Sequence, residues 1–146
     1  MTTTVTPYLI VKDAAAAIAF YERAFGAKET MRLAEPSGRI GHAEISIGGA
    51  TIMIADEYPE MGFRGPQALG GSPVTLVLHV TDVDAVADRA VAAGAAVVIP
   101  VKDQFYGERS GRIRDPFGHL WILSTHVEDV STEEMQRRYT AMLAST

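Results

Sequence analysis

The chain of 146 residues has no cysteine, one tryptophan and no run of lysines or arginines. The lack of cysteine excludes disulfides, thiolate metal sites and cysteine nucleophiles. The net charge of −5, without a basic patch, argues against nucleic acid or an anionic membrane as a partner. No stretch approaches the roughly 18 apolar residues of a membrane span, and residues 1–11 lack the pattern of a signal peptide. We therefore expect a cytoplasmic protein.

The composition, 47% hydrophobic and 21% charged, is ordinary for one globular domain. In the first half, residues 6–12 are predicted to form a strand, and Asp13 is suited to cap the helix that follows. Ile18, Tyr21 and Phe25 fall on one face of that helix. Three further strands are predicted at residues 27–35, 39–47 and 50–56.

The second half repeats this pattern. The triplets VKD at 11–13 and FGA at 25–27 return as VTD at 80–82 and AGA at 93–95. An internal repeat of β-α-β-β-β units follows. We predict an α+β fold with module one at 5–57, a connecting loop at 58–73, module two at 74–129 and a C-terminal helix at 131–145. That helix has one apolar face, which could dock either on its own chain or on a partner subunit.

Residues 106–123 close the second half as a strand, a turn and a strand. Arg112 and Arg114 alternate with Ile113, the period of a half-buried strand. The sequence DPFG at 115–118 has turn chemistry, since Asp caps its own backbone and Gly tolerates a positive φ. In the strand after it, alternation places Trp121 under a helix. His119 is expected to satisfy carbonyls of the turn, and His126 to be exposed.

The doubled unit, with V-x-D opening each helix and D-P-x-G before the last strand, resembles the vicinal-oxygen-chelate superfamily of glyoxalases, bleomycin-resistance proteins and extradiol dioxygenases. The ending resembles its PhnB-like branch. The resemblance implies that the two modules form a U-shaped cleft of antiparallel-rich sheets. It also implies a homodimer, with modules paired within or between chains.

In the metalloenzymes of this family, two histidines and two carboxylates in the cleft bind a divalent metal. The matching positions here are Thr6, Thr75, Ile122 and either Met53 or Ile54. None of these side chains is an ordinary ligand for such a metal. The resemblance therefore implies that the family's metal site is absent, and no cofactor is predicted.

Three polar residues are candidates for chemistry. His79 shares strand parity with Thr75, and His42 and Glu44 share parity on one strand, so that they could form an acid–base pair or, with His79, a displaced metal site. Arg109 is a candidate for binding a carboxylate or phosphonate. The residues predicted to line a ligand-binding cleft are Thr6, Tyr8, Thr75, His79, Phe105, Tyr106, Arg109 and Ile122.

The resemblance, together with the missing metal ligands, implies a metal-independent protein that binds a small molecule, such as an aromatic or antibiotic-like compound that it sequesters. The alternative is an enzyme of the same superfamily, a lyase, isomerase or dioxygenase. It would use a displaced divalent metal or metal-free acid–base residues.

Overall fold

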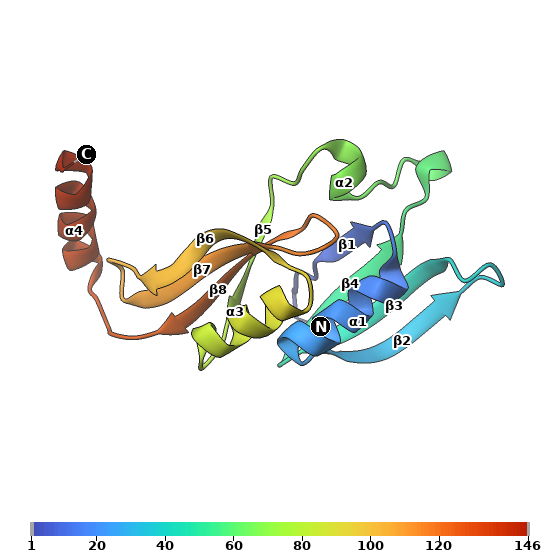
Figure 1. The fold of residues 1–146 in the computed structure, drawn as a ribbon, viewed down its shortest axis with the longest axis horizontal. Helices are drawn as coiled ribbons and strands as arrows, with labels where there is room; N and C mark the ends of the chain where they lie inside the picture. Colours follow the sequence, from blue (N-terminus) through green and yellow to red (C-terminus); the bar gives the residue numbers. More distant parts are fainter. Residues whose placement is uncertain (1, 146) are drawn as a thin grey trace.

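A computed structural model describes residues 2–145. The protein consists of two modules, each a four-stranded sheet covered on one face by a helix (Figure 1). The elements of module one are β1 (Tyr8–Val11), α1 (Ala14–Phe25), β2 (Lys28–Ala34), β3 (Ile40–Ile47) and β4 (Ala50–Asp56). Those of module two are β5 (Thr75–His79), α3 (Val83–Ala92), β6 (Ala96–Asp103), β7 (Glu108–Arg114) and β8 (Leu120–His126). The predicted α+β fold with a doubled βαβββ unit is confirmed.

Both sheets have the same topology. The strand orders are β1-β4-β3-β2 and β5-β8-β7-β6, and in each sheet the first strand pairs parallel with the last while the other pairs are antiparallel. The connecting segment, predicted as loop, contains two short helices, η1 (Pro59–Met61) and α2 (Pro66–Leu69). The C-terminal helix α4 (Thr132–Ala144) projects from the far end of module two (Figure 1). No helix among residues 2–145 has the length and apolar character needed to cross a bilayer.

The helix boundaries follow the capping signals of the sequence. The Asp13 side chain accepts a hydrogen bond from the Ala16 amide at 3.1 Å, and Asp82 does the same for Ala85 at 3.2 Å. Gly26 ends α1 with φ of 70°, a conformation that glycine adopts without steric cost. The repeated V-x-D triplets therefore start equivalent helices in the two modules.

One apolar core runs through both modules, because α1 packs against α3. Trp121 of β8 is 2% exposed and lies beside the rings of Tyr21 and Phe25 in α1, with centroid distances of 5.5 and 4.8 Å. The prediction that Trp121 packs under a helix is confirmed. The helix belongs to the other module, so the tryptophan also joins the two halves.

A buried carboxylate reinforces this junction. Asp115, in the turn between β7 and β8, is 3% exposed and accepts four hydrogen bonds. Two come from the amides of Phe117 (2.9 Å) and His119 (3.0 Å), as the turn motif predicts. The other two come from the hydroxyl of Tyr21 (2.5 Å) and the indole of Trp121 (2.9 Å). Burial, together with the nearby Asp115 charge, raises the pKa of Tyr21 well above its ordinary value, which keeps this phenol a donor.

His119 links the modules as well. Its Nε2 lies 3.0 Å from the carbonyl oxygen of Ile10 in β1. The prediction that this side chain satisfies carbonyls of its own turn was wrong, because the turn packs against module one and brings a carbonyl from that module within reach.

Each sheet thus has a face covered by its helix and an opposite face, here called the open face. Along β1 and β3 the side chains alternate between buried and more exposed, and the register places Tyr8 and Glu44 on either side of Met53 on the open face. In module two Val77, Ile122 and Arg112 lie side by side on three neighbouring strands. The open faces expose large apolar side chains, including Tyr8 (47%) and Val77 (51%).

Candidate functional site

The open face of module one carries a pocket of about 610 Å³. Its floor is formed by Tyr8 and Ile10 of β1, Gly41 of β3 and Ala55 of β4. Its outer wall comes from the connecting segment, with Tyr58, Met61 and Phe63. Large apolar clefts with a few polar groups are typical of small-molecule sites. This pocket is of the size and character to hold a compact aromatic molecule.

A line of three polar side chains begins at Tyr8, which lines the pocket, and continues along the open face outside it. The hydroxyl of Tyr8 lies 2.7 Å from Nδ1 of His42, and Nε2 of His42 lies 2.8 Å from the carboxylate of Glu44. Burial and the Glu44 charge raise the pKa of Tyr8. His42 and Glu44, which share strand parity, are thus hydrogen-bonded to each other. Tyr8 extends the pair to the pocket, so that a proton could pass between the phenol and the imidazole.

The outer wall is held by polar contacts that the sequence did not reveal. The hydroxyl of Tyr58 donates to Glu35 at 2.6 Å, and the guanidinium of Arg39 lies 3.8 Å above the Tyr58 ring. The hydrogen bond to Glu35 raises the pKa of Tyr58. The backbone of Tyr58 also pairs with that of Phe63. Sequence analysis missed these residues because the segment has no periodicity, although its aromatic residues were a usable signal.

A second group surrounds Glu108 on module two. Its carboxylate lies 2.6 Å from Nδ1 of His126, accepts from the Ser124 hydroxyl at 3.1 Å and lies 3.9 Å from Nδ1 of His79. His79 is on the open face, where 73% of its side chain is exposed. His126 is exposed, as predicted, and its Nε2 also contacts Asp129 at 2.7 Å. The structure therefore pairs His79 with Glu108 instead of with His42 and Glu44.

The remaining cleft candidates are divided between the two faces. Phe105, Tyr106 and Ile122 line a pocket of about 340 Å³ on the open face of module two. Thr75 lies beside Leu120 at the start of β5. Arg109 instead points toward α3, where its guanidinium binds Asp84 at 2.9 Å and Asp103 at 3.2 Å. The placement expected for Arg109 was wrong, since its strand parity is opposite to that of Arg112.

The four positions where the family's metalloenzymes carry ligands do not fit a metal. Met53 lies on the open face beside Tyr8, whereas Ile54 is fully buried in the core, so Met53 is the equivalent position. Thr6, Thr75 and Ile122 complete the set. These side chains supply neither an imidazole nor a carboxylate. Within residues 2–145, no three His, Asp or Glu side chains are grouped so that they could hold an ion.

Comparison with known proteins identifies the family. Residues 3–123 match the model of the Glyoxalase/Bleomycin resistance protein/Dioxygenase superfamily. The chain belongs to this superfamily. An uncharacterized protein of Mycobacterium tuberculosis, Rv0887c, is 48% identical over 134 residues, which cover 90% of this chain and 79% of that protein.

Solved structures agree with this assignment. TioX from Micromonospora sp. ML1 is 29% identical, with a TM-score of 0.67 over 86% of this chain and 100% of that chain. A PhnB protein from Bacillus cereus, described as a putative 3-demethylubiquinone-9 3-methyltransferase, has a TM-score of 0.68 over 84% of this chain and 99% of that one. At 19% identity it supports the fold alone. The resemblance to the superfamily is confirmed by the family model, and the PhnB protein shares its fold.

Proposed function

We propose that this superfamily member binds a small aromatic molecule in the module-one pocket, without a metal, and serves to sequester it. The observation that carries the proposal is the apolar pocket of about 610 Å³, in which Tyr8, Tyr58 and Phe63 supply aromatic walls. Aromatic side chains favour planar ligands by stacking as well as by apolar burial. At the four positions where the family's metalloenzymes bind a metal, this chain has no imidazole or carboxylate. This supports a mode of binding that needs no ion.

The proposed functional unit is a homodimer. Apolar side chains on both open faces are exposed in the single chain, among them Tyr8 (47%), Val77 (51%) and Ile99 (42%). Large exposed apolar patches on a protein commonly mark an interface or a ligand groove. Pairing module one of one copy with module two of another would cover both faces, and sedimentation velocity would measure the resulting mass.

The test of ligand binding uses N-phenyl-1-naphthylamine, an uncharged aromatic probe whose fluorescence rises in apolar sites. We expect the double variant Met61→Ser/Phe63→Ser to bind it about tenfold more weakly, since two apolar side chains of the outer wall are truncated. Both residues are exposed, at 64% and 48%, so the fold should be retained. Leu69→Ser/Val127→Ser, at 66% and 58% exposure, is the matched control outside the pocket.

Equal affinity in both double variants would overturn the assignment of the pocket. Binding that disappears after treatment with a chelator, and returns with a divalent metal, would overturn metal independence. Binding that survives the chelator supports the proposal as stated.

A second candidate function, proton transfer without a metal, is favoured by the Tyr8–His42–Glu44 line. A phenol beside an imidazole, which a carboxylate orients, is an arrangement suited to general acid–base catalysis. Ligands that raise the melting temperature would be recovered after incubation and analysed by mass spectrometry. A compound altered by the wild-type protein but not by His42→Gln would identify an enzyme, and unchanged compounds would identify a binding protein.

A further inference from the structure

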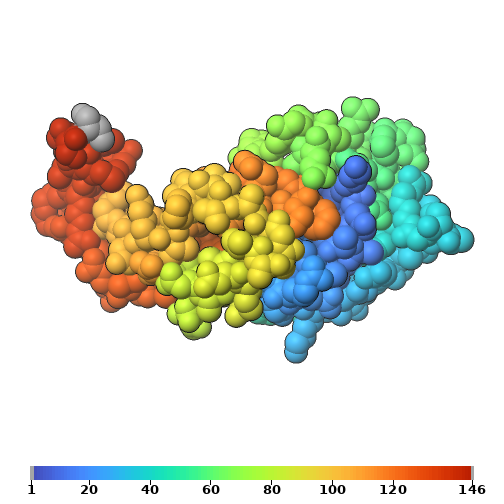
Figure 2. All heavy atoms as spheres, viewed as in Figure 1, coloured from blue at the N-terminus to red at the C-terminus, as the bar shows by residue number. Residues whose placement is uncertain are grey.

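The 340 Å³ pocket of module two lies between the open face and the C-terminal helix. Ile99 and Ile122 form its apolar floor, Phe105 and Tyr106 its aromatic side, and Met142 of α4 closes it from outside. Figure 2 shows α4 projecting at the end of the molecule, beyond the strands of module two. The pocket is thus built from one chain and is separate from the pocket of module one.

The helix that closes this pocket is fixed in place by specific contacts. The ring of Tyr139 stacks on Phe105 with a centroid distance of 5.6 Å and an interplanar angle of 26°. Arg138 donates to the Phe105 carbonyl at 2.8 Å and to Glu128 at 2.8 Å. The same residue, Phe105, therefore joins the helix to the pocket, and α4 forms a defined wall.

Two cations lie at the pocket without a carboxylate partner. Lys102 of β6 is opposite Ser110, and Arg112 of β7 is opposite Ile99, so both belong to the strand positions that line the pocket. Among residues 2–145 neither side chain makes an ion pair or a hydrogen bond. Arg109, on the helix-covered face of the same strand β7, is by contrast bound to two aspartates.

This contrast is informative because the chain as a whole is acidic, with a net charge of −5. Carboxylates are abundant, yet none is placed within reach of the Lys102 ammonium or the Arg112 guanidinium in the described residues. Guanidinium and ammonium groups bind carboxylate, sulfonate and phosphate groups through charge-assisted hydrogen bonds. Both side chains are exposed at the pocket, so a group from outside the chain can bind them.

We propose that this pocket binds an anionic aromatic molecule, with the ring against Phe105 and Tyr106 and the acidic group between Lys102 and Arg112. The inference goes beyond the proposed function, since it assigns a second site, separate from the module-one pocket, and the charge of the molecule bound there. It assigns to α4 the role of a wall of the binding site.

The experiment compares two probes that share one ring system. 8-Anilinonaphthalene-1-sulfonate carries a sulfonate, and N-phenyl-1-naphthylamine lacks it. For Lys102→Met/Arg112→Met we expect the sulfonate probe to bind about tenfold more weakly and the neutral probe to be unaffected. Methionine keeps an unbranched side chain like the aliphatic stems of lysine and arginine, so the substitution removes mainly the charge. Higher salt should weaken only the sulfonate probe.

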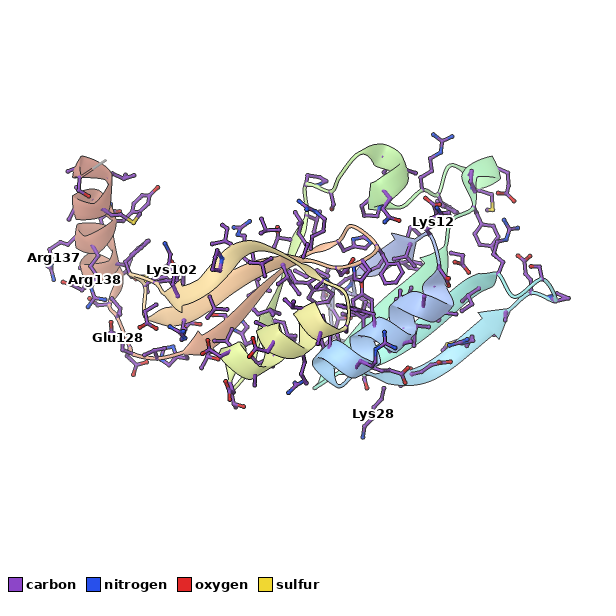
Figure 3. The ribbon with its side chains drawn as sticks, in the orientation of Figure 1. Lys12, Lys28, Lys102, Glu128, Arg137 and Arg138 are labelled. Carbon is purple, nitrogen blue, oxygen red and sulfur yellow. The ribbon has the colours of Figure 1, made fainter. Side chains whose placement is uncertain are left out.

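The control is Lys12→Met/Lys28→Met, which removes two cations of module one that also lack ion-pair partners in the described chain. Figure 3 shows Lys12 and Lys28 on module one, away from Lys102 beside α4. Amide chemical shifts of Lys102, Ser110 and Arg112 should move when the sulfonate probe is added to the wild-type protein. Shifts confined to β1 and β4 would overturn the inference.

Equal losses of sulfonate binding in the two double variants would also overturn the inference, because a general effect of net charge would then explain them. Failure of the proposed function has a different signature: the neutral probe would bind without depending on Met61 and Phe63. The two proposals therefore fail in different measurements.

Discussion

Replacing Asp115 by asparagine tests whether one buried carboxylate holds the two modules together. The wild-type side chain accepts two backbone and two side-chain hydrogen bonds. In Asp115→Asn the remaining oxygen can still accept from the Phe117 and His119 amides. The new NH₂ group then faces the Tyr21 hydroxyl, which can rotate to accept a hydrogen bond, and the Trp121 indole, which can only donate.

The variant thus leaves a buried indole N–H unpaired and exchanges charged hydrogen bonds for neutral ones. An unsatisfied buried donor costs about 1–3 kcal/mol, and hydrogen bonds to charged groups are stronger than those to neutral ones. We expect the free energy of unfolding to fall by about 3 kcal/mol. Tyr21→Phe removes one donor and leaves the carboxylate three partners, so its expected cost is smaller, about 1.5 kcal/mol.

Urea unfolding followed by circular dichroism measures both values from the midpoint and slope. Trp121→Phe provides a further check, because it removes the indole N–H that opposes the new amide. The cost of Asp115→Asn should therefore shrink by about 1 kcal/mol in that background. If Asp115→Asn lies within about 0.5 kcal/mol of wild type, the four-bond account of Asp115 is wrong.

Two further predictions concern module two. Hydrogen bonds to Glu108 and Asp129 raise the pKa of His126 above its ordinary value of about 6.5. The charged form of His126 therefore stabilises the fold below pH 6.5, and this contribution is lost as the pH rises through the folded-state pKa. NMR titration should show the raised pKa of His126, and Glu108→Gln should lower that pKa. Val77→Lys places a charge on the exposed apolar face and should shift the protein from dimer to monomer in sedimentation velocity, whereas a dimer that persists would place the interface elsewhere.

Much of the fold was accessible from sequence because local signals repeat in the two halves. Asp13 and Asp82 cap equivalent helices, and alternation placed Trp121 in the core. The same alternation, applied to Arg109, would have separated it from Arg112. The sequence did not predict which hydrogen-bond partner each buried polar side chain would have. Tyr21 and Asp115 are 94 residues apart and meet only because α1 packs across the junction of the modules.

The binding surfaces were less accessible, for a related reason. The parity of β1 and β3 gave Tyr8, His42 and Glu44, which the structure joins in one line. The wall formed by Tyr58 and Phe63 comes from a segment whose conformation depends on contacts with Glu35 and Arg39. Such contacts leave no periodic pattern.

The two open faces differ in chemistry in a way that bears on their pairing. Module one presents a carboxylate, Glu44, beside an apolar pocket, and module two presents the unpaired cations Lys102 and Arg112 beside another. Because α1 packs on α3 within the chain, part of the helix-covered faces is already used, whereas the open faces expose apolar side chains that a second copy can cover. Opposite charges on the two open faces favour pairing of unlike modules over like ones.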